Sequence, residues 1–276
     1  MGTPFVKDTI AVCIPAAGPV EPIVLGNFMA AVNYAARKKV KLEYFEIMNR
    51  VFIHIARHKL AEKFLKSDAE WSLWLDSDMQ IPQDTIPELL KWAKALDAKL
   101  LSAMYYHRNG THCPLAMWNI VKDAKGRVVK KGKHKYESFT FDIPDTVNEA
   151  IEVDFCGFGC LLIHREVFEK MKLPYFKLIF SEDIPGFSGH NYGADGLQND
   201  DFIGEDIYFC VKARELGYKI YVLPALDLGH IANPEIIRKL DYDKGKRAII
   251  EKNPAILDLR LVKTGGVLLA KHKLKK

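Results

Sequence analysis

Apolar and polar positions along the chain follow two periods, and the first half repeats one unit. Compact apolar runs, typical of buried parallel strands, alternate with stretches whose apolar residues recur every three or four positions, typical of helices. These patterns predict strands at 9–15, 41–48, 71–75 and 99–104, and helices at 23–38, 51–65 and 87–95. Such alternation is typical of α/β proteins and predicts a doubly wound parallel sheet in this half.

The second half has shorter elements and longer polar connections. Its pattern predicts a hairpin of 117–121 with 127–129, a strand at 151–155 leading into 156–163, and a strand at 218–223. Helices are predicted at 165–171, at 205–216 (ended by Gly217) and at 234–239. The paired glycines at 157 and 159 indicate a tight turn or close approach of a ligand. The polar, glycine-rich stretch 181–201 is long enough to be a lid over a site.

Composition places the chain among ordinary globular proteins. It has 276 residues, 49% hydrophobic and 27% charged, with a net charge of +5. The five cysteines are odd in number and most have apolar neighbours, which predicts reduced thiols in the core. No run reaches the roughly 18–20 apolar residues of a transmembrane helix. We therefore expect a cytoplasmic protein without a membrane anchor. The basic tail Lys271–Lys276 is too short to form a nucleic-acid-binding domain.

Two carboxylates stand where the strand at 71–75 ends, in Asp76-Ser77-Asp78. Aspartate is depleted in strands, and ligands of open α/β sheets bind at the carboxyl ends of the strands. Carboxylate oxygens suit hard divalent cations, which in turn clamp diphosphates. The alternative is that Asp76 caps the strand and Asp78 caps a helix beginning at about Pro82.

Three features in chain order strengthen the metal interpretation. They are Asp76-Ser77-Asp78, Gly204-Glu205-Asp206 at the start of a helix, and Gly229-His230 after a late strand. Singly, the acidic pair could complement a helix dipole and His230 could be a surface histidine. Together the set resembles glycosyltransferases of the GT-A fold, including the family 2-like group. Residues 157–168 also resemble the segment before the acceptor site in these enzymes. The resemblance covers roughly residues 9 to 232.

The resemblance implies a Rossmann-like mixed sheet flanked by helices, with a small β element on the acceptor side. It implies one catalytic domain at 1–232, divided into a nucleotide-binding half at about 1–115 and an acceptor half at about 116–232. Residues 233–276 would be a helical extension with the basic tail. The activity implied is metal-dependent transfer of a sugar from a nucleotide sugar, such as a UDP- or GDP-sugar, to an acceptor hydroxyl that the sequence does not identify.

Individual residues take roles from the same resemblance. The metal, Mn²⁺ or Mg²⁺, would be held by Asp78 and His230 and by Asp76, whose contact could instead be ribose or metal-bound water; a histidine ligand favours Mn²⁺. For an inverting enzyme, Asp206 is the first choice for a catalytic base and Glu205 the second, whereas in a retaining enzyme the pair would instead orient the substrate. The donor-binding positions are Pro15, Ala16, Ala17, Arg57, Asp76 and Ser77. For Arg57, a surface salt bridge is the equal alternative to a donor contact.

Two other functions remain open at this level. A nucleotidyltransferase would share the sheet and the acidic metal site, but 15–18 lacks the glycine-rich, basic phosphate loop expected of it. A binding protein of the same fold without turnover would not need to keep both a metal shell and a base. Asp78, Glu205, Asp206 and His230 therefore favour the transferase.

Overall fold

The computed structural model describes residues 6–16, 18, 20–48, 52–105, 118–120, 124–125, 136–138, 149–180 and 202–231. All of these residues belong to one compact unit, 1–232. Several sequence predictions fall outside the described residues: Ala17 at the donor end, the hairpin segment 127–129, the lid at 181–201, and the extension at 233–276 with its helix at 234–239. Among the described residues, no helix is both long and apolar enough to cross a membrane.

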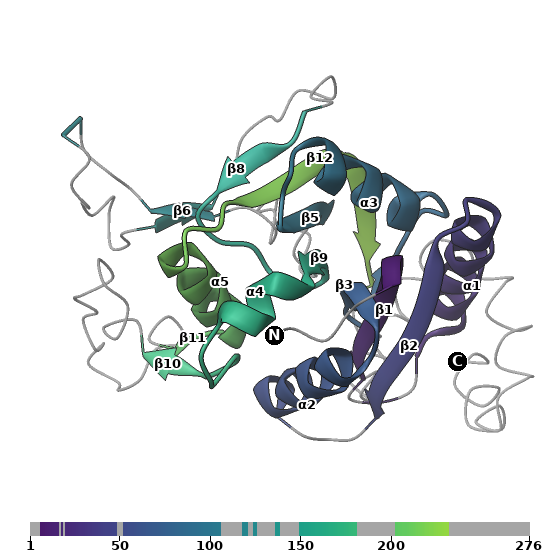
Figure 1. The fold of residues 1–276 in the computed structure, drawn as a ribbon, viewed down its shortest axis with the longest axis horizontal. Coiled ribbons are helices and arrows are strands. Elements are labelled where there is room, and N and C mark those ends of the chain that lie inside the picture. The colour runs from purple at the N-terminus through teal and green to yellow at the C-terminus, as the bar shows by residue number, and fades with distance from the viewer. Residues whose placement is uncertain are drawn as a thin grey trace, which may run out of the picture. The chain divides into compact units, whose positions relative to one another are not determined.

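The unit is a mixed α/β fold in which helices flank a curled sheet (Figure 1). This arrangement confirms the predicted fold class and is compatible with a Rossmann-like GT-A fold. The helices are α1 (Pro22–Arg37), α2 (Ile53–Lys66), α3 (Thr85–Ala95), α4 (Arg165–Lys170) and α5 (Glu205–Glu215). Helix α1 packs against α3, and α2 packs against α4.

The main sheet has the strand order β2-β1-β3-β9-β5-β12-β4, with β8 also paired to β12. Its strands are β1 (Val6–Ala16), β2 (Lys41–Met48), β3 (Ala69–Leu75), β4 (Met79–Gln80), β5 (Leu100–Tyr105), β8 (Ile151–Val153), β9 (Cys160–His164) and β12 (Ile220–His230). Two small ladders lie outside it: β6 (Trp118–Ile120) with β7 (Tyr136–Ser138), and β10 (Ile179–Phe180) with β11 (Phe202–Ile203).

The prediction that the first half forms a doubly wound parallel sheet is wrong. Strands β1, β2 and β3 are parallel, but β9 enters from the second half and pairs antiparallel with both β3 and β5. Strand β9 is buried along its whole length. Two buried hydroxyls fix it from either side, because Ser72 donates to the carbonyl of Ile163 and Ser102 donates to that of Cys160. Apolar periodicity reports burial and does not specify the neighbouring strand.

Two further boundaries differ from the sequence analysis. Strand β6 pairs with β7 at 136–138, whereas the predicted partner segment 127–129 lies outside the described residues. Strand β12 does not stop at Leu223 before Pro224 but continues to His230, with a register shift between Leu223 and Asp227. A proline is tolerated at such an irregularity because the ladder hydrogen bond is already interrupted there. The extension carries His230 to the edge where β3 ends.

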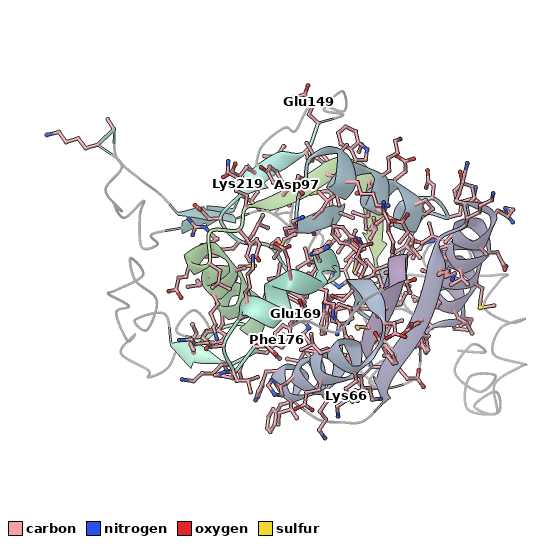
Figure 2. All side chains as sticks on the ribbon, in the orientation of Figure 1. Lys66, Asp97, Glu149, Glu169, Phe176 and Lys219 are labelled. Carbon is pink, nitrogen blue, oxygen red and sulfur yellow. The ribbon has the colours of Figure 1, made fainter. Side chains whose placement is uncertain are left out.

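An aromatic cluster fills the core between β3, α4 and α5. Its rings pack with centroids 5.1–6.4 Å apart. The members are Trp74, Phe158, Phe168, Phe176 (labelled in Figure 2) and Phe209. Four of the five cysteines, at 13, 156, 160 and 210, are buried and free. This confirms the prediction of reduced core thiols for those four.

Close packing explains one of the two paired glycines. The amide of Gly159 donates to the hydroxyl of Tyr105 at 2.9 Å, and the Tyr105 side chain is buried. A Cβ added to Gly159 would stand 2.6 Å from Cζ of the Tyr105 ring. The glycine therefore leaves room for a tyrosine ring at the end of β5, rather than for a ligand.

We expect Gly159→Ala to lower the free energy of unfolding by about 1–3 kcal/mol, the usual range for overpacking a core. The matched variant Gly26→Ala places its new methyl group in open space on helix α1. It should raise stability by about 0.5–1 kcal/mol, because alanine loses less backbone entropy in a helix. Urea unfolding of both variants measures the two changes in the free energy of unfolding. Equal changes would contradict the packing argument.

Candidate functional site

The candidate site lies where β3 ends and its chain turns toward β12. The amide of Met79 donates to the carbonyl of Asp76 at 3.2 Å, closing a turn that leads directly into β4. Helix α3 begins only at Thr85, and its N-cap is Asp84. Asp78 therefore does not cap a helix, and this alternative from the sequence analysis is wrong.

Strand pairing brings His230 beside Asp78. Strand β4 is antiparallel to the end of β12, so that Met79 lies opposite His230. The amide of Ile231 donates to the carbonyl of Asp78 at 2.9 Å. The side chains then meet, with Nε2 of His230 3.4 Å from Oδ2 of Asp78. The ring of Tyr105 packs edge-on against His230, with centroids 5.9 Å apart. A carboxylate and an imidazole from distant segments of the chain thus lie side by side where β4 pairs with the end of β12.

Arg57 lies deep in the same region and is paired with two acids. Its Nη2 donates to Oδ1 of Asp76 at 2.9 Å, and its Nη1 donates to Oε1 of Glu205. The guanidinium also lies over the ring of Phe158, 4.9 Å from its centroid. Arg57 thus forms salt bridges, as one of the two sequence alternatives held, but they are buried and not on the surface, because only 4% of Arg57 is exposed. Burial acts to lower the pKa of Arg57, but attraction to Asp76 and Glu205 prevails and raises it.

The two acids at the start of α5 have different surroundings. Glu205 is buried and held by Arg57, whereas Asp206 is half-buried and its Oδ1 accepts a hydrogen bond from the Ile207 amide at 2.8 Å. Gly204 makes this possible, since a Cβ there would stand 2.4 Å from Oδ1 of Asp206. Burial raises the pKa of Asp206 to about 6, and the charge of Glu205 adds to the rise. Burial also raises the pKa of Asp76, although Arg57 opposes this change.

Three of the predicted donor positions, Pro15, Ala16 and Ser77, lie at the same edge of the sheet. Pro15 and Ala16 end β1, which is parallel to β3, and Cys13 lies opposite Trp74 in that pair. Residues 15 and 16 therefore lie beside the first residues after β3, which begin with Asp76. Ser77 lies in the turn between Asp76 and Asp78 and is half-buried. The structure brings these positions to one edge.

The metal prediction named Asp76, Asp78 and His230 together. Within the described ranges, no group of three histidine, cysteine, aspartate or glutamate side chains is arranged to hold a metal ion. Asp78 and His230 form a close pair, while Asp76 faces Arg57. The protein thus offers two candidate ligands at one point, an oxygen and a nitrogen.

Sequence reasoning missed two residues of this region, Tyr105 and Phe158, and the pairing of Arg57 with Asp76 and Glu205. Tyr105 and Phe158 carry only the ordinary signal of buried aromatic residues. The one available signal was Gly159, whose pairing with Gly157 indicated close approach of something to the backbone. The partners of Arg57 lie 19 and 148 positions away, a separation that no local pattern reports.

Comparison with known proteins gives structural similarities only. No family model matches the chain, and no curated protein matches it. A197 from STIV has a TM-score of 0.48 and 17% identity, over 80% of this chain and 85% of that one. GalNAc-T7, solved with UDP, GalNAc and Mn²⁺, has a TM-score of 0.48 and 13% identity, over 82% of this chain and 44% of that one. This chain thus spans less than half of the GalNAc-T7 chain.

The raised pKa of Asp206 makes a prediction about stability. A carboxyl group whose pKa is higher in the folded state penalises folding when it is ionised, above about pH 6. Asp206→Asn removes that penalty and keeps an oxygen for the Ile207 amide. We expect its Tm to exceed that of the native protein by a few degrees at pH 7.5.

The advantage of Asp206→Asn should shrink as the pH falls through 6 and vanish near the pKa of an unfolded aspartate, about 4. Differential scanning fluorimetry of both proteins at pH 7.5, 6 and 4.5 gives the comparison. A constant difference across this range would show that Asp206 ionises normally.

Proposed function

We propose that this chain is a metal-dependent glycosyltransferase that moves a sugar from a nucleotide sugar to an acceptor hydroxyl. The observation that supports it best is the approach of Asp78 and His230, 3.4 Å apart, at the carboxyl edge of the sheet. Ligands of open α/β sheets bind at this edge. Through Arg57, the same edge also receives the acidic start of α5.

Asp78 and His230 fit a divalent cation shared with a substrate. Such ions are commonly bound through one or two protein side chains, with substrate phosphates and waters completing the shell. An imidazole ligand favours Mn²⁺ over Mg²⁺. Carboxylates gather around this point: Arg57 contacts Asp76 and Glu205, Asp206 follows Glu205, and Asp78 faces His230. When bound, the metal would neutralise charge on the departing diphosphate.

The donor would lie along the ends of β1 and β3. Pro15, Ala16 and Ala17 have small or rigid side chains that would let a nucleoside approach the backbone. Ser77 and the partly exposed Asp76 would face its ribose or phosphates. A UDP- or GDP-sugar is the proposed donor class.

Asp206 is the proposed general base. A base works best when its pKa lies near the operating pH, and the pKa of Asp206 is raised to about 6. In this step the acceptor hydroxyl gives its proton to Asp206 and its oxygen bonds to the anomeric carbon. The bond from that carbon to the diphosphate breaks, and its electron pair leaves with the phosphate. Glu205 is less suited to this role, because Arg57 already holds its carboxylate.

The metal and donor assignments are tested together by thermal-shift measurement with UDP-, GDP-, ADP- and CMP-sugars, each with Mn²⁺ and with a chelator. We expect one nucleotide class to stabilise the native protein only when Mn²⁺ is present. Asp78→Asn and His230→Ala should each weaken Mn²⁺-dependent nucleotide binding by about tenfold or more, the scale of losing a metal contact.

A matched pair elsewhere on the chain controls for loss of a histidine–carboxylate contact. His58 and Glu62 on α2 lie 3.8 Å apart, and His58→Ala and Glu62→Gln should leave nucleotide binding unchanged. Binding that is equally strong in all four variants would remove the metal assignment.

The base assignment is tested by transfer rate. Asp206→Asn should reduce kcat by roughly 10²-fold or more while the donor still binds, because only proton transfer is lost. For the native protein, kcat should fall as the pH drops below about 6. Asp227→Asn, an exposed aspartate on β12, is the control. Donor binding without transfer in the native protein would instead identify a non-catalytic binder.

A further inference from the structure

The buried guanidinium of Arg57 joins elements that are far apart in the chain. It extends from α2, and its two terminal nitrogens contact Asp76 after β3 and Glu205 at the start of α5. Phe158, from the segment before β9, lies beneath it. We call Arg57 with Asp76 and Glu205 the Arg57 bridge. Its end on Asp76 is itself fixed, because the amide of Asp76 donates to the carbonyl of Gly159 at 3.1 Å.

The start of α5 depends on contacts outside the helix. Its N-cap is Gly204, which has no side chain to bond the free amides of the first turn. Glu205, the first helical residue, directs its carboxylate to Arg57. Asp206 follows immediately and accepts from the Ile207 amide. The position of Asp206 is thus set within one residue of the ion pair between Arg57 and Glu205.

We propose that Arg57 is a positioning residue: its two-armed contact fixes the first turn of α5 against the end of β3 and thereby holds Asp206 in place. The role in catalysis rests on the function proposed above, whereas the role in fixing the helix does not. It favours the salt bridge over the donor contact, the two alternatives that the sequence left equal for Arg57, because the guanidinium is buried and both terminal nitrogens contact carboxylates. The remaining nitrogen, Nε, is buried and has no hydrogen-bond partner in the described structure.

The geometry requires arginine. A guanidinium presents donors in a rigid planar fork and reaches two acids at once, whereas an ammonium is a compact point charge on a flexible stem. Arg57→Lys should therefore keep the charge and lose one arm of the bridge. A second buried arginine offers a matched control. Arg165, 2% exposed, donates to backbone carbonyls of Leu65 and Ser67 at the other end of α2.

Hydrogen exchange tests the bridge without any assay of activity. The amide of Tyr208 bonds to the Gly204 carbonyl in the first turn of α5, and that of Leu216 bonds to the Lys212 carbonyl in the last. In Arg57→Lys we expect exchange at Tyr208 to accelerate by about tenfold or more while Leu216 is unchanged, since local openings differ along one element. Arg165→Lys should alter neither amide selectively. Unchanged exchange at Tyr208 in Arg57→Lys would overturn the proposal.

The effect of Arg57 on catalysis is tested by measuring nucleotide binding and kcat separately. We expect Arg57→Lys to bind Mn²⁺ with UDP as the native protein does and to lose roughly 10- to 100-fold in kcat, the scale of a misplaced catalytic group. If Arg57→Lys instead binds UDP more weakly and exchanges normally at Tyr208, Arg57 contacts the donor and does not position α5, and the proposal is wrong. If the native protein transfers no sugar, the proposed function is wrong. The positioning role of Arg57 is then tested by hydrogen exchange alone.

A second variant keeps the test open if Arg57→Lys does not fold. Glu205→Gln is nearly isosteric and leaves Arg57 balanced by Asp76, while it weakens the arm that reaches α5. Its exchange at Tyr208 should also rise relative to Leu216. Protection equal to that of the native helix would contradict a fixing role for the arm on Glu205.

Discussion

The arrangement of the candidate site depends on one buried cation shared by two carboxylates. Arg57 loses nearly all contact with water, and a charge removed from water is tolerated only where partners replace its hydration. Its partners come from the end of β3 and the start of α5. These two elements therefore cannot separate without leaving a charge unpaired in the interior. The face of the aromatic cluster beneath Arg57 adds a further favourable contact.

The acids around Arg57 are only partly neutralised by it. Asp76 and Asp206 both have raised pKa values, and in each case burial is the largest cause. Grouping carboxylates in this way opposes folding, and such arrangements are typical of sites whose chemistry needs a poised acid or base.

Much of the fold could be predicted from the sequence, because burial leaves a local record. Apolar runs identified β1, β3 and β5, and helical spacing identified α1, α2 and α5, including the end of α5 before Gly217, where φ is +86°. Strand neighbours leave no such record, and so the place of β9 between β3 and β5 was missed.

The candidate site, too, could be predicted only in part from the sequence. The acidic and histidine positions were identified from residue type and chain order, while the partners of Arg57 and the wedge of Tyr105 against Gly159 depend on three-dimensional packing. The assigned roles of these residues remain proposals. The donor residue Ala17 and the lid at 181–201 lie outside the described part of the chain.

The insertion of β9 has a consequence for how the protein acquires its structure during synthesis. Residues 71–75 pair with 160–164, and 100–102 pair with the same strand. Until the ribosome has released residue 164, β3 and β5 each present an unpaired, apolar edge, the kind of surface that drives aggregation. Residues 1–115 alone therefore lack the strand that joins β3 to β5. The order of translation delays completion of the sheet until the second half arrives.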